Sequence, residues 1–293
     1  MTRRGPRNSL RGAASCSQHS IRRLSAALVI ALLTSSCVVV DPGFNARRLA
    51  QSARLQRELV QTDSFLLTSF VRITTPYEPI NIYIEGDGRA WQSTTEPALD
   101  PTPHRAMALQ LAAKDPASNV VYLARPCQYT DHDPYCEVSH WTERRYSREV
   151  IAAMNEAVSH YAALAPKQPL HLIGYSGGGA LAILIASRRN DISSIRTVAG
   201  NLDLDEVMRL NRVSPIPQSV NPMSAARSVA RIPQIHFSGA NDTIVPPAIA
   251  ERFARAVGGS CVQTRVVAGM SHEGSWADIW QRLQSEMVVC GSP

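Results

Sequence analysis

One short motif constrains the fold of this chain more than any other feature: G-Y-S-G-G at positions 174–178 lies between two apolar segments. Residues 170–173 before it have the length and composition of a buried strand, and residues 178–188 after it have those of a buried helix. A strand that turns sharply into a helix at G-x-S-x-G presents its serine on a strained turn, which flanking glycines permit. We therefore expect Ser176 to be a nucleophile. The alternative is a glycine-rich turn with a passive serine.

Short apolar segments alternate with longer helical segments along the rest of the chain. Strands that are separated by helices are best buried as a mainly parallel sheet with helices on both faces, an α/β fold. After position 37 the chain has 256 residues (293 − 37), which suits one large domain. We expect strands at 80–84, 120–124, 170–175, 195–199, 234–237 and 263–268, and helices at 105–113, 148–164, 178–188 and 248–257.

Three regions follow from this pattern. Residues 65–293 are expected to form the catalytic domain, which begins with the alternating apolar residues of 65–73. Residues 38–64 are expected to be a linker or a leading helix, because 46–61 has apolar residues at helical spacing. Residues 201–231 carry three prolines and little periodicity, and form either a small cap or a simple crossover connection.

A neutral serine hydroxyl is a poor nucleophile, and histidine is the side chain best suited to accept its proton. His272 in G-M-S-H-E-G at 269–274 lies on a loop directly after the last expected strand, from which it could reach Ser176. His171 and His236 fall inside expected strands and fit the core better. The remaining histidines lie in the leader or before Ser176, which is the wrong order for this architecture: His19, His104, His132, His140 and His160.

A catalytic histidine needs a carboxylate that fixes its tautomer and stabilises the imidazolium. Asp242 in G-A-N-D-T-I-V-P at 239–246 follows the expected strand 234–237 and precedes His272 in the chain. Asp203 and Asp205 are the competitors, because a triad acid can also reach the histidine from the end of the preceding strand. A surface turn would explain Asn-Asp but not the order Ser176, Asp242, His272.

These three motifs resemble those of the α/β-hydrolase family, over about residues 65–283. The resemblance implies the α/β-hydrolase fold and a serine nucleophile, but no particular substrate. It also implies an oxyanion hole made by the amide of Gly177 and an amide from residues 86–88, which we assign to Asp87. Where many members have His-Gly, this chain has E-G-D-G at 85–88.

The acidic residues of that loop need an explanation, because a negative charge beside an oxyanion costs several kcal/mol at about 4 Å and intermediate dielectric. Glu85 and Asp87 are therefore expected to point away from the site or to pair with Arg89 or Arg125. The functional alternative is that one of the two carboxylates binds the amino group of a substrate.

Residues 1–37 are typical of an export signal. Arg22 and Arg23 precede an apolar segment at 24–33, which is too short to span a bilayer, and small residues follow it. Cys37 then resembles the lipid-attachment cysteine of bacterial lipoproteins, although Thr34 stands where that pattern has an aliphatic residue. We expect an exported protein that is periplasmic or extracellular. Three outcomes are open for its leader: a lipid anchor at Cys37, plain secretion, or a retained anchor.

The net charge of +6 does not indicate a nucleic-acid partner. Six arginines precede position 41 and no acid does, so that 24 basic and 24 acidic residues remain in the rest of the chain (30 − 6 = 24). We expect no nucleic-acid binding, and membrane contact only through the lipid anchor.

The cysteines support export. Beyond the leader the chain has four, an even number that suits an oxidising compartment. Pairing of neighbours predicts the disulfides Cys127 to Cys136 and Cys261 to Cys290. A metal site around His132, between Cys127 and Cys136, is the rival interpretation, but CxxC spacing and a second histidine are missing. We therefore expect neither metal nor cofactor.

Together these features predict a serine hydrolase that cleaves small-molecule carboxylic esters through an acyl-enzyme. A serine peptidase or amidase of the same fold is the first alternative. A non-catalytic envelope binding protein is the second. The sequence carries no prediction of the oligomeric state.

Overall fold

The computed structural model describes residues 41–93, 95–130, 133–287 and 290. The export signal expected at 1–37, the candidate lipid-attachment residue Cys37 and the candidate metal ligand His132 lie outside the described residues. No helix among the described residues has both the length and the apolar character needed to cross a bilayer.

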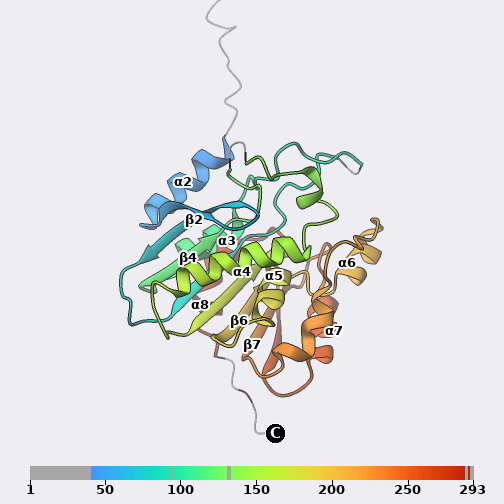
Figure 1. Cartoon of the computed structure of the whole chain (residues 1–293). Helices are drawn as coiled ribbons and strands as arrows, with labels where there is room; N and C mark the ends of the chain where they lie inside the picture. The colour runs from blue at the N-terminus through green and yellow to red at the C-terminus, as the bar shows by residue number, and fades with distance from the viewer. Residues whose placement is uncertain (1–40, 94, 131–132, 288–289, 291–293) are drawn as a thin grey trace, which may run out of the picture. The chain divides into compact units, whose positions relative to one another are not determined.

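One eight-stranded sheet forms the centre of the described chain (Figure 1). Its strands lie in the order β1-β2-β4-β3-β5-β6-β7-β8. β2 pairs antiparallel with both β1 and β4, and every other neighbouring pair is parallel, which confirms the mainly parallel sheet expected from the sequence. The strands are β1 Gln56–Gln61, β2 Leu66–Ile73, β3 Ile80–Ile84, β4 Asn119–Leu123, β5 Leu170–Tyr175, β6 Ile192–Val198, β7 Gln234–Gly239 and β8 Val262–Val267.

Helices cover both faces of this sheet, because successive side chains of its central strands point to opposite sides. In β3, Ile82 joins the hydrophobic cluster on one face and Tyr83 joins the cluster on the other. The first cluster is completed by α4 Arg148–Ala162, α5 Gly177–Ala186, α6 Leu204–Asn211, α7 Pro247–Val257 and the 3-10 helix η2 Pro222–Val229. The second is completed by α2 Pro42–Ser52, α3 Met107–Ala113 and α8 Trp276–Gln284.

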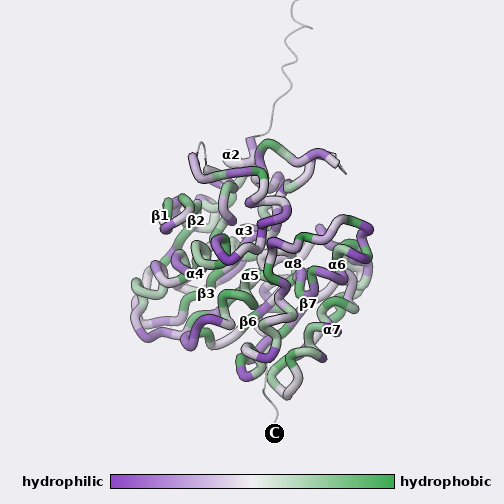
Figure 2. The backbone as a smooth tube through the Cα atoms, turned by 45° about the vertical axis from the view of Figure 1, so that its right-hand side comes forward, coloured by the Kyte–Doolittle hydropathy of each residue, from purple (hydrophilic) through white to green (hydrophobic). Residues whose placement is uncertain are grey.

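Helix α5 follows the G-Y-S-G-G motif and lies deepest among the helices that the structure describes. All ten of its residues are buried, which agrees with a sequence that is apolar on every side. Hydrophobic residues gather on α5 and on the central strands in Figure 2. This packing fixes the start of α5, and with it the position of Ser176, relative to the sheet.

The structure differs from the sequence-based expectation in the segment expected to be a leading helix. Helix α2 begins at Pro42, where the side chain of Asp41 accepts a hydrogen bond from Gly43, and ends at Ser52. Residues 56–61 form β1, an edge strand of the main sheet. The helical prediction for 46–61 is therefore wrong in its second half, because pairing with β2 outweighs the local helical spacing.

The segment 201–231 is a crossover connection between β6 and β7. It contains α6 and η2, whose apolar side chains belong to the same core cluster as α5. The structure therefore supports the crossover alternative rather than the cap. The sequence patterns did not predict α6, η2, α8 or the short 3-10 helix η1 (Val138–His140).

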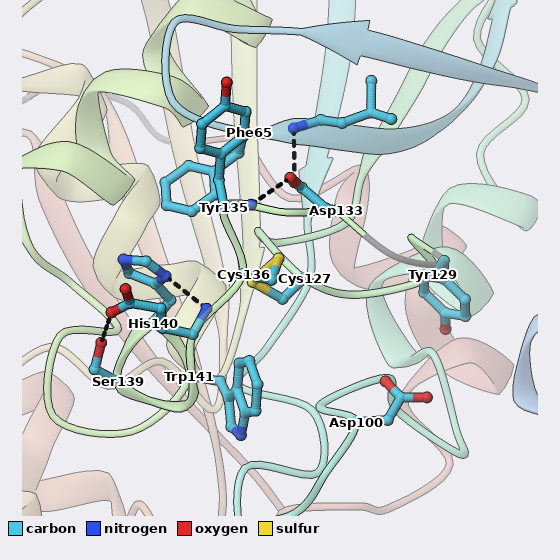
Figure 3. The surroundings of a disulfide bond; sticks show 12 residues. Phe65, Asp100, Cys127, Tyr129, Asp133, Tyr135, Cys136, Ser139, His140 and Trp141 are labelled. Atoms are coloured by element: carbon cyan, nitrogen blue, oxygen red, sulfur yellow. Dashed lines mark hydrogen bonds between the residues drawn. A yellow bond between two sulfur atoms is a disulfide. The ribbon is translucent and has the colours of Figure 1, made fainter.

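Both expected disulfides are present. Cys127 pairs with Cys136 beside the ring of Trp141, and the surroundings of this bond are shown in Figure 3. Cys261 pairs with Cys290 and joins the region before β8 to the end of the chain. On the loop-entropy model, each disulfide lowers the conformational entropy of the unfolded chain and so stabilises the fold by about 2 to 4 kcal/mol.

Candidate active site

Ser176 lies at the turn between β5 and α5 with a strained backbone. Its φ of 50° and ψ of −117° place it outside the regions that side-chain-bearing residues usually adopt. The turn is held because the amide of Ser176 donates to the carbonyl of Val198, at 2.9 Å. A Cβ on Gly174 would lie 2.3 Å from the carbonyl oxygen of Gly178, so glycine is needed there for strand and helix to approach.

The structure brings His272 and Asp242 together with Ser176. The Ser176 hydroxyl lies 3.0 Å from Nε2 of His272, and Nδ1 of His272 lies 2.9 Å from Oδ2 of Asp242. All three side chains are buried. The order hydroxyl, imidazole, carboxylate is that of a triad in which the imidazole takes the serine proton and the carboxylate fixes its tautomer.

Asp242 is fixed by the backbone of its own loop after β7. Its Oδ1 accepts hydrogen bonds from the amides of Ile244, at 2.9 Å, and Val245, at 2.8 Å. Its other oxygen is thereby left to face His272. The alternative acids are engaged elsewhere. Asp203 accepts from the amide of Glu206 at the start of α6 and pairs with Arg252 at 2.9 Å, and Asp205 accepts from Asn221.

His272 lies on the loop between β8 and α8, and two aromatic side chains hold its backbone. The hydroxyl of Tyr175 donates to the carbonyl of His272 at 3.2 Å, and the indole of Trp276 donates to the same oxygen at 3.1 Å. Because Trp276 is the first residue of α8, this helix fixes the backbone of His272. Sequence patterns did not predict α8, although its two buried tryptophans, Trp276 and Trp280, were an available signal.

The other histidines named from the sequence take different places. His236 is fully buried in β7, where burial lowers its pKa to about 3 and keeps it neutral. His171 lies inside β5, as expected, and bonds to Ser194 of the neighbouring strand β6. His140 is buried beside Glu149, and burial lowers its pKa. Among the described histidines, His272 alone forms a hydrogen bond with Ser176.

The two amides assigned to the oxyanion hole belong to Gly177 and Asp87. Among the described residues, neither Gly177 nor Asp87 donates its backbone N–H. Their loops lie against each other, since a Cβ on Gly86 would be 3.2 Å from Cβ of Ser176. Free amides next to a serine hydroxyl are the donors that an oxyanion formed at that hydroxyl would require.

Asp87 pairs with Arg125, one of the two partners expected from the sequence. Its carboxylate forms an ion pair with Arg125 and accepts a hydrogen bond from the hydroxyl of Tyr146 at 2.6 Å. Arg145 adds a second cation at 3.5 Å. Burial alone would raise the pKa of Asp87, but the two guanidinium groups and the Tyr146 hydroxyl outweigh it and lower that pKa. Arg145 and Tyr146 were not anticipated from the sequence.

Glu85 points away from the site into the core. It is 1% exposed, and its Oε1 accepts from the amides of Gly86 at 2.9 Å and Ala108 at 3.2 Å. Burial raises the pKa of Glu85 to about 7, against the smaller opposing effect of these hydrogen bonds. No described cation pairs with it. Arg89, its other expected partner, instead contacts His104.

The described residues contain no group of three or more histidine, cysteine, aspartate or glutamate side chains arranged to hold a metal ion. The residue set at Ser176 can act on a carbonyl carbon with its own hydroxyl, imidazole and amides.

No protein-family model and no curated protein matches the chain. Among solved structures, Est1E from Butyrivibrio proteoclasticus is similar, with 12% identity and a TM-score of 0.57 over 78% of this chain and 96% of that one. An acylaminoacyl peptidase from Pyrococcus horikoshii has 10% identity and a TM-score of 0.55, over 82% of this chain and 42% of that one.

A third similar structure is an alpha-beta serine hydrolase homologue from Coxiella burnetii. It has 13% identity and a TM-score of 0.51, over 78% of this chain and 93% of that one. At these identities the likeness concerns the fold alone, and it confirms the fold class expected from the sequence.

Proposed function

We propose that this chain, which has the α/β-hydrolase fold, is a serine hydrolase that cleaves carboxylic esters. The observation that carries the proposal is the buried chain of hydrogen bonds from Ser176 through His272 to Asp242, with distances of 3.0 and 2.9 Å. Residues 96 and 30 positions apart in the chain meet in this geometry, which a passive serine turn does not require.

The proposed reaction proceeds through an acyl-enzyme. The Oγ of Ser176 bonds to the ester carbonyl carbon while its proton passes to Nε2 of His272. The amides of Gly177 and Asp87 donate to the resulting oxyanion. The bond to the leaving oxygen then breaks, and His272 returns the proton to that oxygen. Water then attacks the acyl carbonyl carbon while His272 takes its proton, the bond to Ser176 Oγ breaks, and His272 returns the proton to Oγ as the acid leaves. Asp242 accepts the hydrogen bond from Nδ1–H of His272 throughout.

The acidic loop supports ester substrates over peptides with a free amino terminus. The peptidase alternative gains weight if Glu85 or Asp87 binds a substrate amine. Glu85 is buried and faces the core, and Asp87 already interacts with Arg125, Arg145 and Tyr146. Glu85 is closed off from solvent in the core, and an amine at Asp87 would have to displace a buried cation.

Steady-state turnover of p-nitrophenyl esters and of aminoacyl p-nitroanilides tests this proposal. We expect ester turnover that falls by about 10⁴-fold or more in Ser176→Ala and in His272→Ala. Ser187→Ala is the matched control, because this serine lies at the opposite end of α5 from Ser176, where its hydroxyl donates to the carbonyl of Leu184 and accepts from Arg188. Unchanged turnover in Ser176→Ala would overturn the hydrolase proposal, and cleavage of anilides alone would overturn the ester preference.

We also propose that the protein is exported with the leader at 1–37. Two disulfides, Cys127–Cys136 and Cys261–Cys290, support an oxidising compartment. The lipid anchor at Cys37 is tested by fractionation: Cys37→Ser should move the protein from the membrane fraction to the soluble fraction. The same distribution for both forms would argue against lipidation and for plain secretion or a retained anchor.

A further inference from the structure

The carboxylate of Asp87 lies directly against the residue that follows the nucleophile. A Cβ built on Gly177 would be 2.0 Å from Oδ1 of Asp87 and 2.6 Å from the hydroxyl of Tyr146. Only a glycine leaves room for these groups. Among the described residues, the backbone amides of Asp87 and Gly177 have no acceptor, and these are the two donors of the proposed oxyanion hole. The Asp87 carboxylate therefore links the two residues that supply these donors.

Groups from the two ends of the connection between β4 and α4 hold this carboxylate in place. Arg125 follows β4, while Arg145 and Tyr146 precede α4. Tyr146 is fully buried, Arg125 is 4% exposed and Arg145 is 7% exposed, whereas the Asp87 side chain is 20% exposed. Buried donors that converge on one carboxylate fix its position, because leaving them unpaired would be costly.

The same network reaches the nucleophile turn. The side-chain amide of Asn201 donates to the hydroxyl of Tyr146 at 3.3 Å, and the backbone amide of Asn201 donates to the carbonyl of Ser176 at 2.9 Å. On the other side, the side chain of Gln128 donates to the carbonyl of Gly86 at 3.1 Å. The loop that carries Asp87 is thus tied both to the core and to the turn at Ser176.

We propose that the Asp87 carboxylate is a positioning group that aligns the amides of Asp87 and Gly177 for the oxyanion, with Tyr146 and Arg125 holding it. This inference rests on the proposed function and adds a role to the side chain of Asp87. Misplacement of an oxyanion donor by a fraction of an ångström weakens it only when the oxyanion forms, so the effect belongs in kcat rather than in KM.

The sign of the effect separates positioning from charge. A negative charge near a developing oxyanion opposes it, so Asp87→Asn would raise kcat if charge were all that mattered. Positioning predicts the reverse, because an amide cannot pair with Arg125 and Arg145 as a carboxylate does.

The test uses two variants and a matched control in ester hydrolysis. Tyr146→Phe removes one hydroxyl and keeps the ring, and Asp87→Asn removes the charge and keeps the shape. Tyr161→Phe is the control, because this buried tyrosine bonds to Ser69 and Glu58 away from the site. We expect kcat to fall about tenfold in the first two variants with KM within about twofold, and both constants to stay within about twofold in the control.

A trifluoromethyl ketone, whose adduct with a serine is an oxyanion, provides the second readout. Its inhibition constant should rise in parallel with the loss of kcat in Tyr146→Phe. Unchanged or raised kcat in both variants, with turnover still dependent on Ser176, would overturn the positioning role alone. Turnover that does not depend on Ser176 would overturn the proposed function and the positioning role together.

Discussion

Glu85 and Asp87 are two residues apart in the chain, yet their carboxyl groups lie in opposite environments. Glu85 lies in the core, where no described cation pairs with it, and burial raises its pKa to about 7. Asp87 lies between two guanidinium groups and a tyrosine hydroxyl, and its pKa is lowered despite its burial. Cationic partners, rather than burial alone, therefore decide whether a buried carboxyl group stays charged.

The difference also matters for the site. At pH values below its pKa of about 7, Glu85 is mostly protonated and adds little charge near the oxyanion hole, and a charged Asp87 is offset by Arg125 and Arg145. The acidic loop can therefore border a site that holds negative charge. Four variants test this contrast.

Asp87→Ala should have the largest effect, on stability. It leaves Arg125 and Arg145 buried without their carboxylate, and loss of one partner of a buried ion pair costs about 3 to 5 kcal/mol. Urea unfolding measures this loss. Asp191→Ala is the control, because its pair with Arg189 is more exposed and should contribute about 1 kcal/mol or less. Equal losses of stability in Asp87→Ala and Asp191→Ala would mean that the buried ion pairs of Asp87 contribute no more than a more exposed one.

Gly177→Ala should lower kcat by about 10² to 10³-fold, equivalent to about 3 to 4 kcal/mol of activation free energy. The added methyl would displace the Asp87 carboxylate, from which it would be 2.0 Å away. Gly43→Ala in α2 is the control, because the atom nearest to its Cβ belongs to the flexible side chain of Arg47. Normal turnover in Gly177→Ala would show that catalysis does not depend on the position of the Asp87 carboxylate beside residue 177.

In the wild type, ionisation of Glu85 should lower the free energy of unfolding by about 3 kcal/mol between low and high pH, and Glu85→Gln should remove this pH dependence. The folded pKa of about 7 exceeds the ordinary 4.5. Glu85 therefore stabilises the fold fully below about pH 4.5, and this contribution is lost as the pH rises through about 7. Urea unfolding at about pH 5 and about pH 8 measures it.

The expected result is a smaller difference between the two pH values in Glu85→Gln than in the wild type. Glu251→Gln, on an exposed position of α7, is the control and should keep the wild-type difference. If Glu85→Gln kept it as well, the buried carboxyl group would not be the source of the pH dependence.

Gln128→Ala should have the smallest effect, about 1 to 2 kcal/mol of stability by urea unfolding. Gln128 is 1% exposed; it donates to the carbonyl of Gly86, between the two acids, and accepts from the amide of Arg125. A loss as large as that of Asp87→Ala would mean that the backbone of this loop, rather than its ion pairs, holds the region together.

The sequence predicted the parts of the molecule that short local patterns determine. The central strands and α5 follow from apolar runs, and the turn at Ser176 follows from its glycines. The loops of Asp242 and His272 could be placed because each comes directly after a strand end. The structure brings these three residues into one chain of hydrogen bonds.

The partners of Asp87 could not be predicted in full, because they come from loops that meet only in the folded protein. Arg125 was anticipated, whereas Arg145, Tyr146 and Asn201 have no local signal that relates them to position 87. Strand β1 was missed for a similar reason, since its pairing with β2 outweighs the helical spacing of 46–61.

The most direct test of the account is covalent labelling of Ser176 by a fluorophosphonate, read by mass spectrometry of the peptide that contains it. Attack on this probe requires the serine to be activated by His272, 3.0 Å away. We expect one adduct on Ser176 in the wild type, none in Ser176→Ala and a strongly reduced yield in His272→Ala. A wild-type protein that stays unlabelled, or an adduct on another residue that survives Ser176→Ala, would contradict it.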